Sequence, residues 1–224
     1  MALAKIISGA VSGIEAFRVE VETDVGMTGD PQIVIVGLPD AAVRESQHRV
    51  SSAVANSGYE PFFGRITVNL APADIRKEGP FFDLPIAVGI LLASGALSAA
   101  SGKSSNKADK ELFESRAMDL DTVAMIGELS LAGEVRRVRG VLPIAIKLRE
   151  LGITKFLVPV ENAVEAAVVE GLEVYPVKNL RQAAQIMIGE DVLTKPVISN
   201  VREIYSEHDS SSDPDYYEVK GQEM

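Results

Sequence analysis

The 224-residue chain contains no cysteine, no tryptophan and only two histidines, His48 and His208. The lack of cysteine excludes disulfides, thiolate metal sites and cysteine nucleophiles, and two histidines are too few for a multi-histidine metal centre. Aromatic residues make up only 5% of the sequence, so the 46% of hydrophobic residues must build an aliphatic core. No apolar run reaches the roughly 18 residues of a membrane span, and the N-terminus lacks the features of a signal peptide. We therefore expect a soluble cytoplasmic protein that has no membrane partner.

Acidic residues outnumber basic residues by 32 to 22, which gives a net charge of −10. This balance argues against a surface devoted wholly to nucleic acid. Half of the excess lies in residues 202–224, where seven acids accompany two bases and a run of serines. We interpret residues 192–215 as an acidic linker. A second low-complexity stretch, at about 98–121, is expected to be a polar surface insert within a single domain of residues 1–191.

Hydrophobic periodicity predicts strands and helices in alternation. Alternation of period two indicates strands, and apolar residues three or four apart indicate helices. We expect strands at 4–11, 16–25, 32–36, 65–70, 155–160 and 172–177, a second hairpin within 123–135, and helices that begin near residues 40, 83, 140, 162 and 179. Residues 32–36 are read as a buried strand. The sequence of elements predicts an α/β fold but does not fix the strand order.

Individual residues within these elements carry more local predictions. Val19, Val21 and Thr23 should share one face of their strand, because successive side chains alternate between the two faces. Asp40 and Asp83 stand where helices begin, and aspartate at that position is a good N-cap.

One motif resembles part of a nucleotide-binding loop. Ser101-Gly102-Lys103-Ser104 looks like the end of a P-loop, but the first glycine of such a loop, which belongs at position 97, is replaced by Leu97. The surroundings are rich in serine, alanine and lysine. We therefore interpret the motif as part of a solvated loop and expect no ATP hydrolysis by this chain alone.

Three carboxylates near two prolines invite an acid–base interpretation. Asp74, Glu78 and Asp83 could supply a general acid and a general base. The simpler interpretation is that Asp83 caps a helix, whereas Asp74 and Glu78 are loop charges beside Arg76 and Lys77. We favour the simpler interpretation.

His48 lies on the predicted helix that follows residue 40, among Arg44 and Arg49. No acid and no nucleophile stand at a spacing that would complete a catalytic set, so we interpret His48 as a surface residue. Glu45 and Arg49 are four residues apart and are expected to pair on the exposed side of this helix.

Two basic groups stand out in an acidic chain. They are Arg76 with Lys77, and Arg136 with Arg137 and Arg139. Such residues are ordinarily a solvated face, but two clusters can form a local phosphate-binding patch despite the overall sign of the charge. Both readings stay open on the residues alone.

Longer strings carry a family resemblance. VGLPDAAVRESQHRVSSAVANSG (36–58), RITVNLAPADIRKEGPFFDLPIAVGIL (65–91) and GELSLAGEVRRVRGVLPIAI (127–146) resemble the N-terminal domain of the magnesium-chelatase-like AAA+ ATPases of the ComM/YifB group. Residues 216–224 look like the opening of the AAA+ module in that family, so the chain is expected to be a fragment. The stretch 101–121 is longer and more polar than the resemblance implies.

The resemblance implies a Lon-protease-like fold, the two-layer α/β fold of ribosomal protein S5 domain 2, with a left-handed β-α-β crossover. Lon-type peptidases use a serine that follows a Lys-Asp-Gly-Pro string, and a lysine that activates it. The matching string here is Lys77-Glu78-Gly79-Pro80, and the serine position holds Phe81. The lysine position falls at Leu142. Neither side chain can attack or transfer a proton, so a peptidase is not expected.

The resemblance further implies a hexameric ATPase that acts on branched DNA during recombination. ATP and Mg²⁺ are expected in the missing AAA+ module, and this chain should bind no cofactor. Within it, the expected DNA-contacting residues are Arg76, Lys77, Arg136, Arg137 and Arg139, with Arg44 and Arg49 as weaker candidates. A related Lon-like domain in the RadA recombination protein is associated with DNA, which favours this assignment.

Other functions remain open on the sequence. The domain could be a purely structural oligomerisation module that contacts neighbouring subunits and the AAA+ ring. A residual Ser-Lys peptidase is disfavoured because both dyad residues are absent. A magnesium-chelatase subunit proper is a further alternative, although such subunits are not expected to begin with a Lon-like domain.

Overall fold

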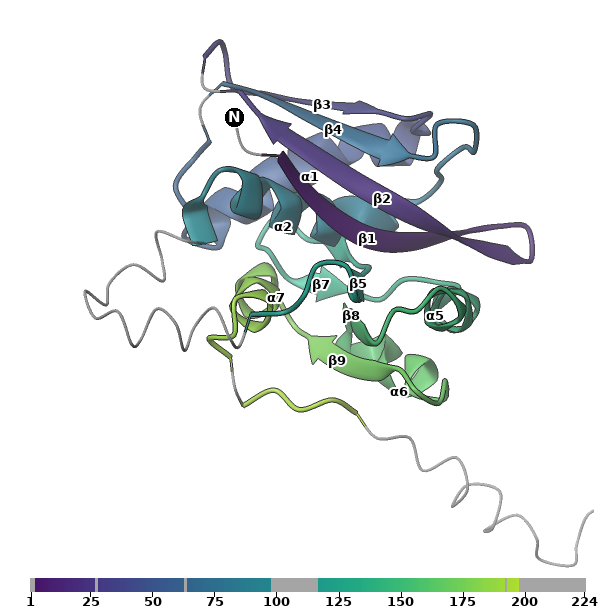
Figure 1. Cartoon of the computed structure of the whole chain (residues 1–224). Coiled ribbons are helices and arrows are strands. Elements are labelled where there is room, and N and C mark those ends of the chain that lie inside the picture. The colour runs from purple at the N-terminus through teal and green to yellow at the C-terminus, as the bar shows by residue number, and fades with distance from the viewer. Residues whose placement is uncertain (1–2, 27, 63, 98–116, 192, 198–224) are drawn as a thin grey trace, which may run out of the picture.

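A computed structural model describes residues 3–26, 28–62, 64–97, 117–191 and 193–197 (Figure 1). They form a seven-stranded sheet in the order β3-β4-β2-β1-β5-β8-β9 and a two-stranded ribbon of β6 and β7. The strands of the sheet are β1 (Leu3–Ser12), β2 (Glu15–Val25), β3 (Gln32–Val36), β4 (Arg65–Ala71), β5 (Val123–Met125), β8 (Lys155–Pro159) and β9 (Glu173–Val177). The ribbon consists of β6 (Glu128–Leu129) and β7 (Val135–Arg136).

The sheet is mostly parallel and takes strands from the two blocks of sequence on either side of the expected insert. β2 pairs antiparallel with β1 and with β4, whereas β3–β4, β1–β5, β5–β8 and β8–β9 are parallel pairs. The two blocks meet where Ile7 of β1 pairs with Ala124 of β5. The predicted α/β class is therefore confirmed, and this pairing fixes the strand order that periodicity left open.

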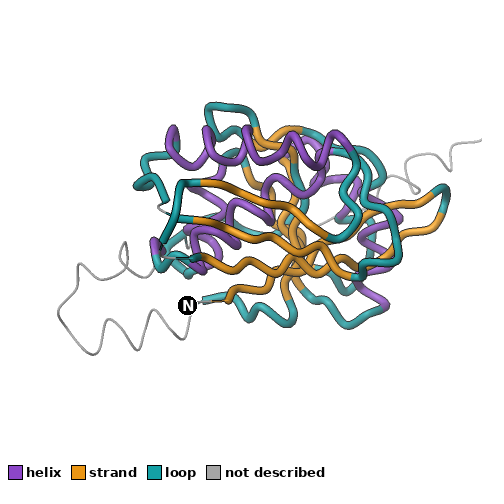
Figure 2. Tube along the Cα trace, turned by 90° about the horizontal axis from the view of Figure 1, so that it is seen from above, coloured by secondary structure: helices purple, strands orange, loops and turns teal. Residues whose placement is uncertain are grey.

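Helices pack on the strands, which run side by side when seen from above (Figure 2). The α-helices are α1 (Ala41–Asn56), α2 (Asp83–Ala93), α5 (Val141–Glu150), α6 (Ala163–Ala166) and α7 (Leu180–Met187), and the 3₁₀ turns are η1 (Pro80–Phe82) and η2 (Val160–Asn162). Side chains of α1, α2 and α7 share one apolar core, and side chains of α5 and α6 share another.

The two cores lie on opposite faces of the sheet. Ile6 and Leu157 belong to the first core, whereas their chain neighbours Ile7 and Phe156 belong to the second. Successive residues of a strand point to opposite faces, so helices cover both faces around β1, β5 and β8. The expected two-layer arrangement is therefore wrong for this half of the molecule, because α5 and α6 add a third layer.

Several local predictions are confirmed. Val19, Val21 and Thr23 of β2 are all fully buried on one face. Asp40 caps α1, since its Oδ1 accepts a hydrogen bond from the Val43 N–H at 2.7 Å. Asn179 does the same for α7, where it accepts from the Gln182 N–H at 2.8 Å.

Two strand predictions are corrected. The hairpin expected within 123–135, with its turn at Ala132-Gly133, is confirmed only in its second half, because β6 pairs with β7 whereas β5 joins the main sheet. β3 is not a buried strand. It lies at the edge of the sheet, and Ile33 is its one buried residue.

Parts of the chain with predicted features lie outside the described residues. These parts are the P-loop-like residues 101–104, nearly all of the insert, and residues 198–224. Of the predicted linker, residues 193–197 are described, and the Val197 N–H donates to the Val174 carbonyl of β9 at 2.8 Å. The domain boundaries therefore remain predictions.

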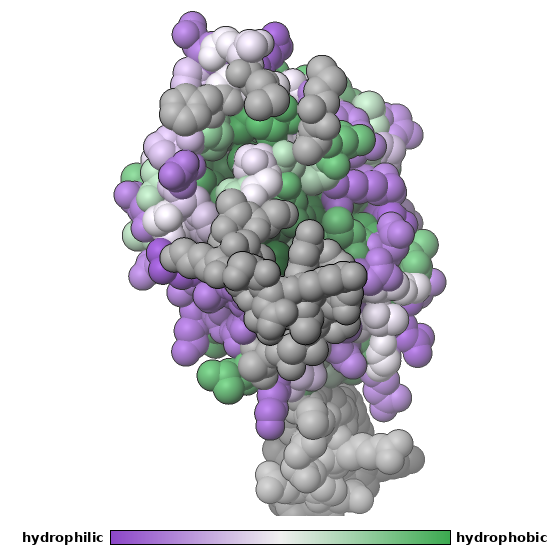
Figure 3. Space-filling model, turned by 60° about the vertical axis from the view of Figure 1, so that its left-hand side comes forward, coloured by the Kyte–Doolittle hydropathy of each residue, from purple (hydrophilic) through white to green (hydrophobic). Residues whose placement is uncertain are grey.

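The surface of the described chain is mixed in polarity. On the face shown in Figure 3, hydrophobic side chains gather in the upper half between hydrophilic ones. None of the helices in the described ranges has the length and apolarity needed to cross a membrane.

The packing of α5 on β1 depends on the lack of a side chain at Gly9. A Cβ atom at this position would lie 2.5 Å from Cγ2 of Ile144 on α5. We expect Gly9→Ala to lower the free energy of unfolding by about 1–3 kcal/mol, as overpacking does in other cores. Urea unfolding measures this loss of free energy. Ile144→Leu removes the Cγ2 atom, so Gly9→Ala should lower the free energy of unfolding by less in an Ile144→Leu background than in the wild type. An equal loss in both backgrounds would contradict the packing argument.

Candidate functional site

The two positions that the resemblance assigns to a hydrolase dyad are apolar and packed. Phe81 lies in η1, is half-buried and contacts both cores, and its ring meets that of Phe82 edge-on with centroids 6.3 Å apart. Leu142 is half-buried in the first turn of α5. A phenyl ring and an isobutyl group offer neither a nucleophile nor a base.

The two motif strings around these positions are joined through the backbone. The Gly127 N–H donates to the Phe81 carbonyl at 3.0 Å, and the Leu84 N–H donates to the Gly127 carbonyl at 3.0 Å. The link between β5 and β6 is thereby fixed against η1 and the start of α2.

Asp83 is fully buried beside this junction and receives three hydrogen bonds. Nε and Nη2 of Arg49 donate to its carboxylate at 2.7 and 3.0 Å, and the Leu129 N–H donates at 3.1 Å. The expectation that Asp83 caps its own helix is wrong, because the carboxylate turns toward α1 and β6. The expected Glu45–Arg49 pair is also corrected, since the Arg49 guanidinium binds Asp83 instead.

This ion pair removes Arg49 from the candidates for phosphate binding. The hydrogen bond to Asp83 is the main cause that raises the pKa of Arg49 above its ordinary value. The Arg49 side chain is 22% exposed and also donates to the Ala42 carbonyl and to Ser46 Oγ. Its Nε and Nη2 donors are therefore engaged within the protein.

Lys77 is also withdrawn from the predicted DNA-binding set. The residue has no exposed surface, and its ammonium donates to the carbonyls of Ile75, at 2.7 Å, and of Pro72. Burial lowers the pKa of Lys77 below its ordinary value, and the nearby charge of Asp74 opposes this shift in part. A side chain without exposed surface cannot reach a phosphate, so Lys77 acts inside the loop that carries it.

That loop is tied to the loop after β3. The Lys77 N–H donates to the Leu38 carbonyl at 3.1 Å, the Asp40 N–H donates to the Lys77 carbonyl at 3.0 Å, and the Gly79 N–H donates to Asp40 Oδ2 at 3.3 Å. Residues 37–40 and 72–79 therefore form one connected surface. Leu38 has a φ of 57° and is 54% exposed, although leucine rarely adopts this left-handed conformation.

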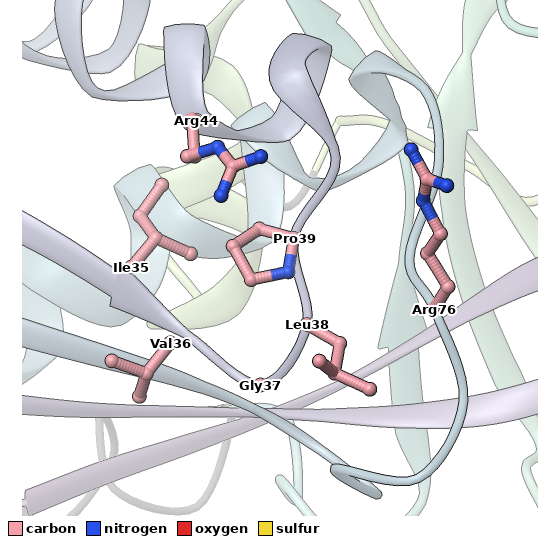
Figure 4. A pocket seen from close by; sticks show the side chains of 7 residues that line it. All are labelled: Ile35, Val36, Gly37, Leu38, Pro39, Arg44 and Arg76. Carbon is pink, nitrogen blue, oxygen red and sulfur yellow. The ribbon is translucent and has the colours of Figure 1, made fainter.

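A shallow groove lies on this surface, and we call it the β3 groove. It is lined by Ile35, Val36, Gly37, Leu38, Pro39, Arg44 and Arg76. Figure 4 shows the guanidinium groups of Arg44 and Arg76 on either side of Pro39. Arg76 Nε lies 3.5 Å from Glu78 Oε1 in an exposed pair, whereas Arg44 forms no ion pair with any described residue. Exposed pairs contribute little, so both guanidinium groups remain accessible to an anion.

The second basic group lies on β7 and the link to α5. Arg136, Arg137 and Arg139 are all exposed, and Arg136 Nη1 lies 3.9 Å from Glu128 Oε1. Val138 between them is buried. Arg76 belongs to a different part of the chain, the loop after β4, and lines the β3 groove.

Residues 136–139, which we call the arginine segment, are fixed from the core side by Asn162. The sequence analysis did not identify Asn162 as a functional residue. The buried Asn162 amide accepts from the Val138 N–H at 2.9 Å and donates to the Val138 carbonyl at 3.0 Å. Its Nδ2 also donates to Glu165, whose other carboxylate oxygen accepts from the Leu142 N–H at 3.2 Å. No spacing rule identifies this contact, because Asn162 and Val138 are 24 residues apart.

The remaining sequence candidates form no site. His48 is exposed and its ring lies 3.3 Å from the Gln47 amide, which confirms a surface residue. Asp74 and Glu78 are exposed loop charges, whereas Asp83 is buried, so the three do not make an acid–base pair. Among the residues that the structure describes, no group of three His, Asp or Glu side chains could hold a metal ion.

Comparison with known proteins places the chain in a family. The family model for subunit ChlI of Mg-chelatase matches residues 19–162, which include Phe81, Leu142 and the arginines of both basic groups. The chain belongs to this Mg-chelatase ChlI-like family. Among curated relatives, the competence protein ComM of Haemophilus influenzae is 38% identical over 193 residues, which are 86% of this chain and 34% of that protein.

Two further relatives of this chain extend the comparison. An uncharacterized protein YifB of Escherichia coli is 34% identical over 224 residues, which are 100% of this chain and 39% of that protein. Lon protease 2 of Bacillus subtilis is more distant, with 26% identity over 183 residues, 77% of this chain and 29% of the protease. The predicted ComM/YifB resemblance is confirmed. The chain spans about a third of the length of the ComM and YifB relatives.

The buried ion pair predicts an asymmetry between two arginines of α1. Arg49→Met leaves the Asp83 carboxylate buried without its cation, so we expect the free energy of unfolding to fall by about 3 kcal/mol or more. The matched control Arg44→Met removes an exposed arginine from the same helix and should change it by less than about 0.5 kcal/mol. Chemical denaturation compares the two. Asp83→Leu combined with Arg49→Met should recover much of the loss, and equal effects of the two single arginine variants would contradict the assignment.

The buried ammonium of Lys77 predicts a pH effect. Its pKa is lower in the folded chain than the ordinary value of about 10.4 in the unfolded chain. Between these two values the unfolded state binds more protons, so the free energy of unfolding rises with pH. Lys77→Met lacks this contribution. The wild type should therefore gain stability relative to the variant as pH is raised from about 7 toward 10.4 in urea titrations, and a constant difference would show that the ammonium is not desolvated.

Proposed function

We propose that this chain is a non-catalytic, Lon-protease-like domain of a ComM/YifB-type AAA+ ATPase, and that it contacts DNA phosphates through Arg136, Arg137 and Arg139. The observation that carries the proposal is the exposed arginine segment, whose backbone Asn162 holds from within the core. The finer fold assignment, a relative of ribosomal protein S5 domain 2 in which α5 and α6 add a third layer, is part of the proposal and is supported by the similarity to Lon proteases.

The non-catalytic part of the proposal rests on two side chains. Phe81 and Leu142 stand where the resemblance places a nucleophilic serine and its activating lysine, and Phe81 is packed against both cores. Supplying both groups would require two substitutions and a repacked core. ATP and Mg²⁺ binding are assigned to an AAA+ module of the full-length protein, for which the greater length of the relatives leaves room.

The DNA-binding part of the proposal rests on the positive charge of Arg136, Arg137 and Arg139 and on their exposure to solvent. Three guanidinium groups within four residues form a local positive surface on a chain whose net charge is −10. Arginine donates to phosphate oxygens through a planar fork, so the contacts should be independent of base sequence. Arg76 in the β3 groove stays a further candidate for a phosphate contact. A role in recombination of branched or single-stranded DNA, a hexameric ring and a cytoplasmic location belong to the same proposal. One relative is named a competence protein, which supports a role in competence.

A structural oligomerisation module is the second candidate, and one observation favours it. Val160 in η2, Val164 in α6 and Val168 in the turn after α6 have exposed fractions of 39%, 68% and 43%. Three exposed apolar side chains within nine residues favour a surface that is covered by a neighbouring subunit.

Salt dependence tests the DNA proposal. With the 224-residue chain and a fluorescein-labelled 20-nucleotide single strand, we expect log K to fall linearly with log salt concentration. Replacing Arg136, Arg137 and Arg139 by glutamine should weaken binding and reduce the slope by about 2, since each lost phosphate contact on a single strand accounts for roughly 0.7.

A matched control removes three exposed basic residues elsewhere. Arg149→Gln, Lys178→Gln and Lys195→Gln change the net charge equally but leave the arginine segment intact. An equal loss of affinity in both triple variants would mean that net charge alone governs binding. No binding at low salt, together with self-association in sedimentation, would favour the oligomerisation module.

A further inference from the structure

The outer edge of β3 is open. β3 is the terminal strand of the sheet, and within the described residues it pairs only with β4. The Gln32 N–H donates to the Gly64 carbonyl at 3.4 Å, and Gln32 lies opposite Arg65 in a parallel register. Since backbone groups alternate in direction along a strand, those of residues 32, 34 and 36 point toward β4. The N–H and C=O groups of Ile33 and Ile35 therefore point outward.

This edge differs from the other edge of the sheet. At the opposite end, β9 is covered where Val174 accepts a hydrogen bond from Val197. β3 has no such cover among the described residues, and its sequence QIVIV contains no charge, proline or glycine. Proteins commonly protect an exposed strand edge with these residues or with a covering segment. The lack of protection in a strand of high β-propensity marks β3 as a place where another strand can add.

The β3 groove lies directly at the end of this open edge. Ile35 and Val36 belong to both the strand and the groove, and the exposed Leu38 continues the apolar surface in a strained left-handed conformation. Such strain persists where the surrounding structure enforces it, and it gathers at functional sites. Here the Lys77 N–H holds the Leu38 carbonyl at 3.1 Å.

Two cations border the apolar part. Arg44 reaches the groove from α1 and Arg76 from the loop after β4, with Pro39 between them (Figure 4). No acidic residue lines the groove itself. Three acids stand beside the lining residues. Glu78 lies 3.5 Å from Arg76 in an exposed pair, Glu45 neighbours Arg44 in the sequence, and the Asp40 carboxylate accepts backbone hydrogen bonds from Val43 and Gly79. The charge of the groove is therefore complementary to an acidic ligand.

We propose that β3 binds an extended acidic peptide segment of a partner protein as an added strand. The peptide backbone pairs with Ile33 and Ile35, one apolar side chain contacts Ile35 and Leu38, and its carboxylates bind Arg44 and Arg76. A peptide fits better than a nucleic acid because the open edge offers alternating amide donors and carbonyl acceptors, which a sugar-phosphate backbone does not match. This interaction surface is separate from the arginine segment on β7.

A designed peptide tests this inference on the 224-residue chain. The probe is a fluorescein-labelled decapeptide of alternating glutamate and valine, and fluorescence anisotropy measures its binding. We expect a Kd below about 1 mM and at least about tenfold weaker binding to the double variant Arg44→Glu and Arg76→Glu, since like charges then face each other. Arg149→Glu with Lys178→Glu is the matched control and should leave the affinity unchanged within about twofold.

Two further probes separate backbone pairing from simple charge attraction. N-methylation of four consecutive central residues removes backbone donors from both edges of the peptide, so binding should fall at least about tenfold. Undiminished binding of the methylated peptide would overturn strand addition. Equal binding of a lysine–valine decapeptide, or no binding of the acidic one at 1 mM, would overturn the proposal as a whole. Displacement of the peptide by a single-stranded oligonucleotide at lower concentration would assign the groove to nucleic acid instead.

Discussion

The buried carboxylate of Asp83 connects three parts of the molecule. It receives Arg49 from the middle of α1 and the Leu129 N–H from β6, while its own backbone begins α2. A buried charge is costly unless it is paired and fully hydrogen-bonded, so these partners must stay in place together. The arrangement positions η1, and with it Phe81, against the Gly127 backbone. The backbone hydrogen bonds of Gly127 to Phe81 and Leu84 lie next to this carboxylate in the chain and fix the position of Phe81.

A second buried cation shapes the loop beside this junction. Lys77 directs its ammonium inward to two carbonyl groups, and its backbone holds the left-handed Leu38. A lysine in a basic pair would ordinarily be assigned to the surface, but here it stabilises the loop that presents Arg76. Structural use of charge inside the loops therefore leaves fewer cations on the surface of the described chain than the basic residues of the sequence suggest.

The two surfaces differ in what they can recognise. The segment 136–139 presents guanidinium groups from a backbone clamped by Asn162, which suits phosphates in any sequence. The β3 groove combines cations with an apolar floor and an open strand edge, which suits an extended peptide. If both proposals hold, the domain is an adaptor that binds a nucleic acid through one element and a protein through another.

The sequence by itself determined most of the elements and the apolar residues at the two positions that the resemblance assigns to a dyad. Alternation identified the faces of β2, the position of Asp40 identified the start of α1, and residues 81 and 142 are Phe and Leu whatever the fold. These features are local or are fixed by residue identity. Tertiary structure decided which polar groups pair with each other. Asp83 and Arg49 are 34 residues apart in the sequence, and Asn162 and Val138 are 24 apart. Periodicity carries no information about such distant contacts, so only the packed sheet and helices show that Lys77 is buried, that β3 lies at an edge, and that helices cover both faces.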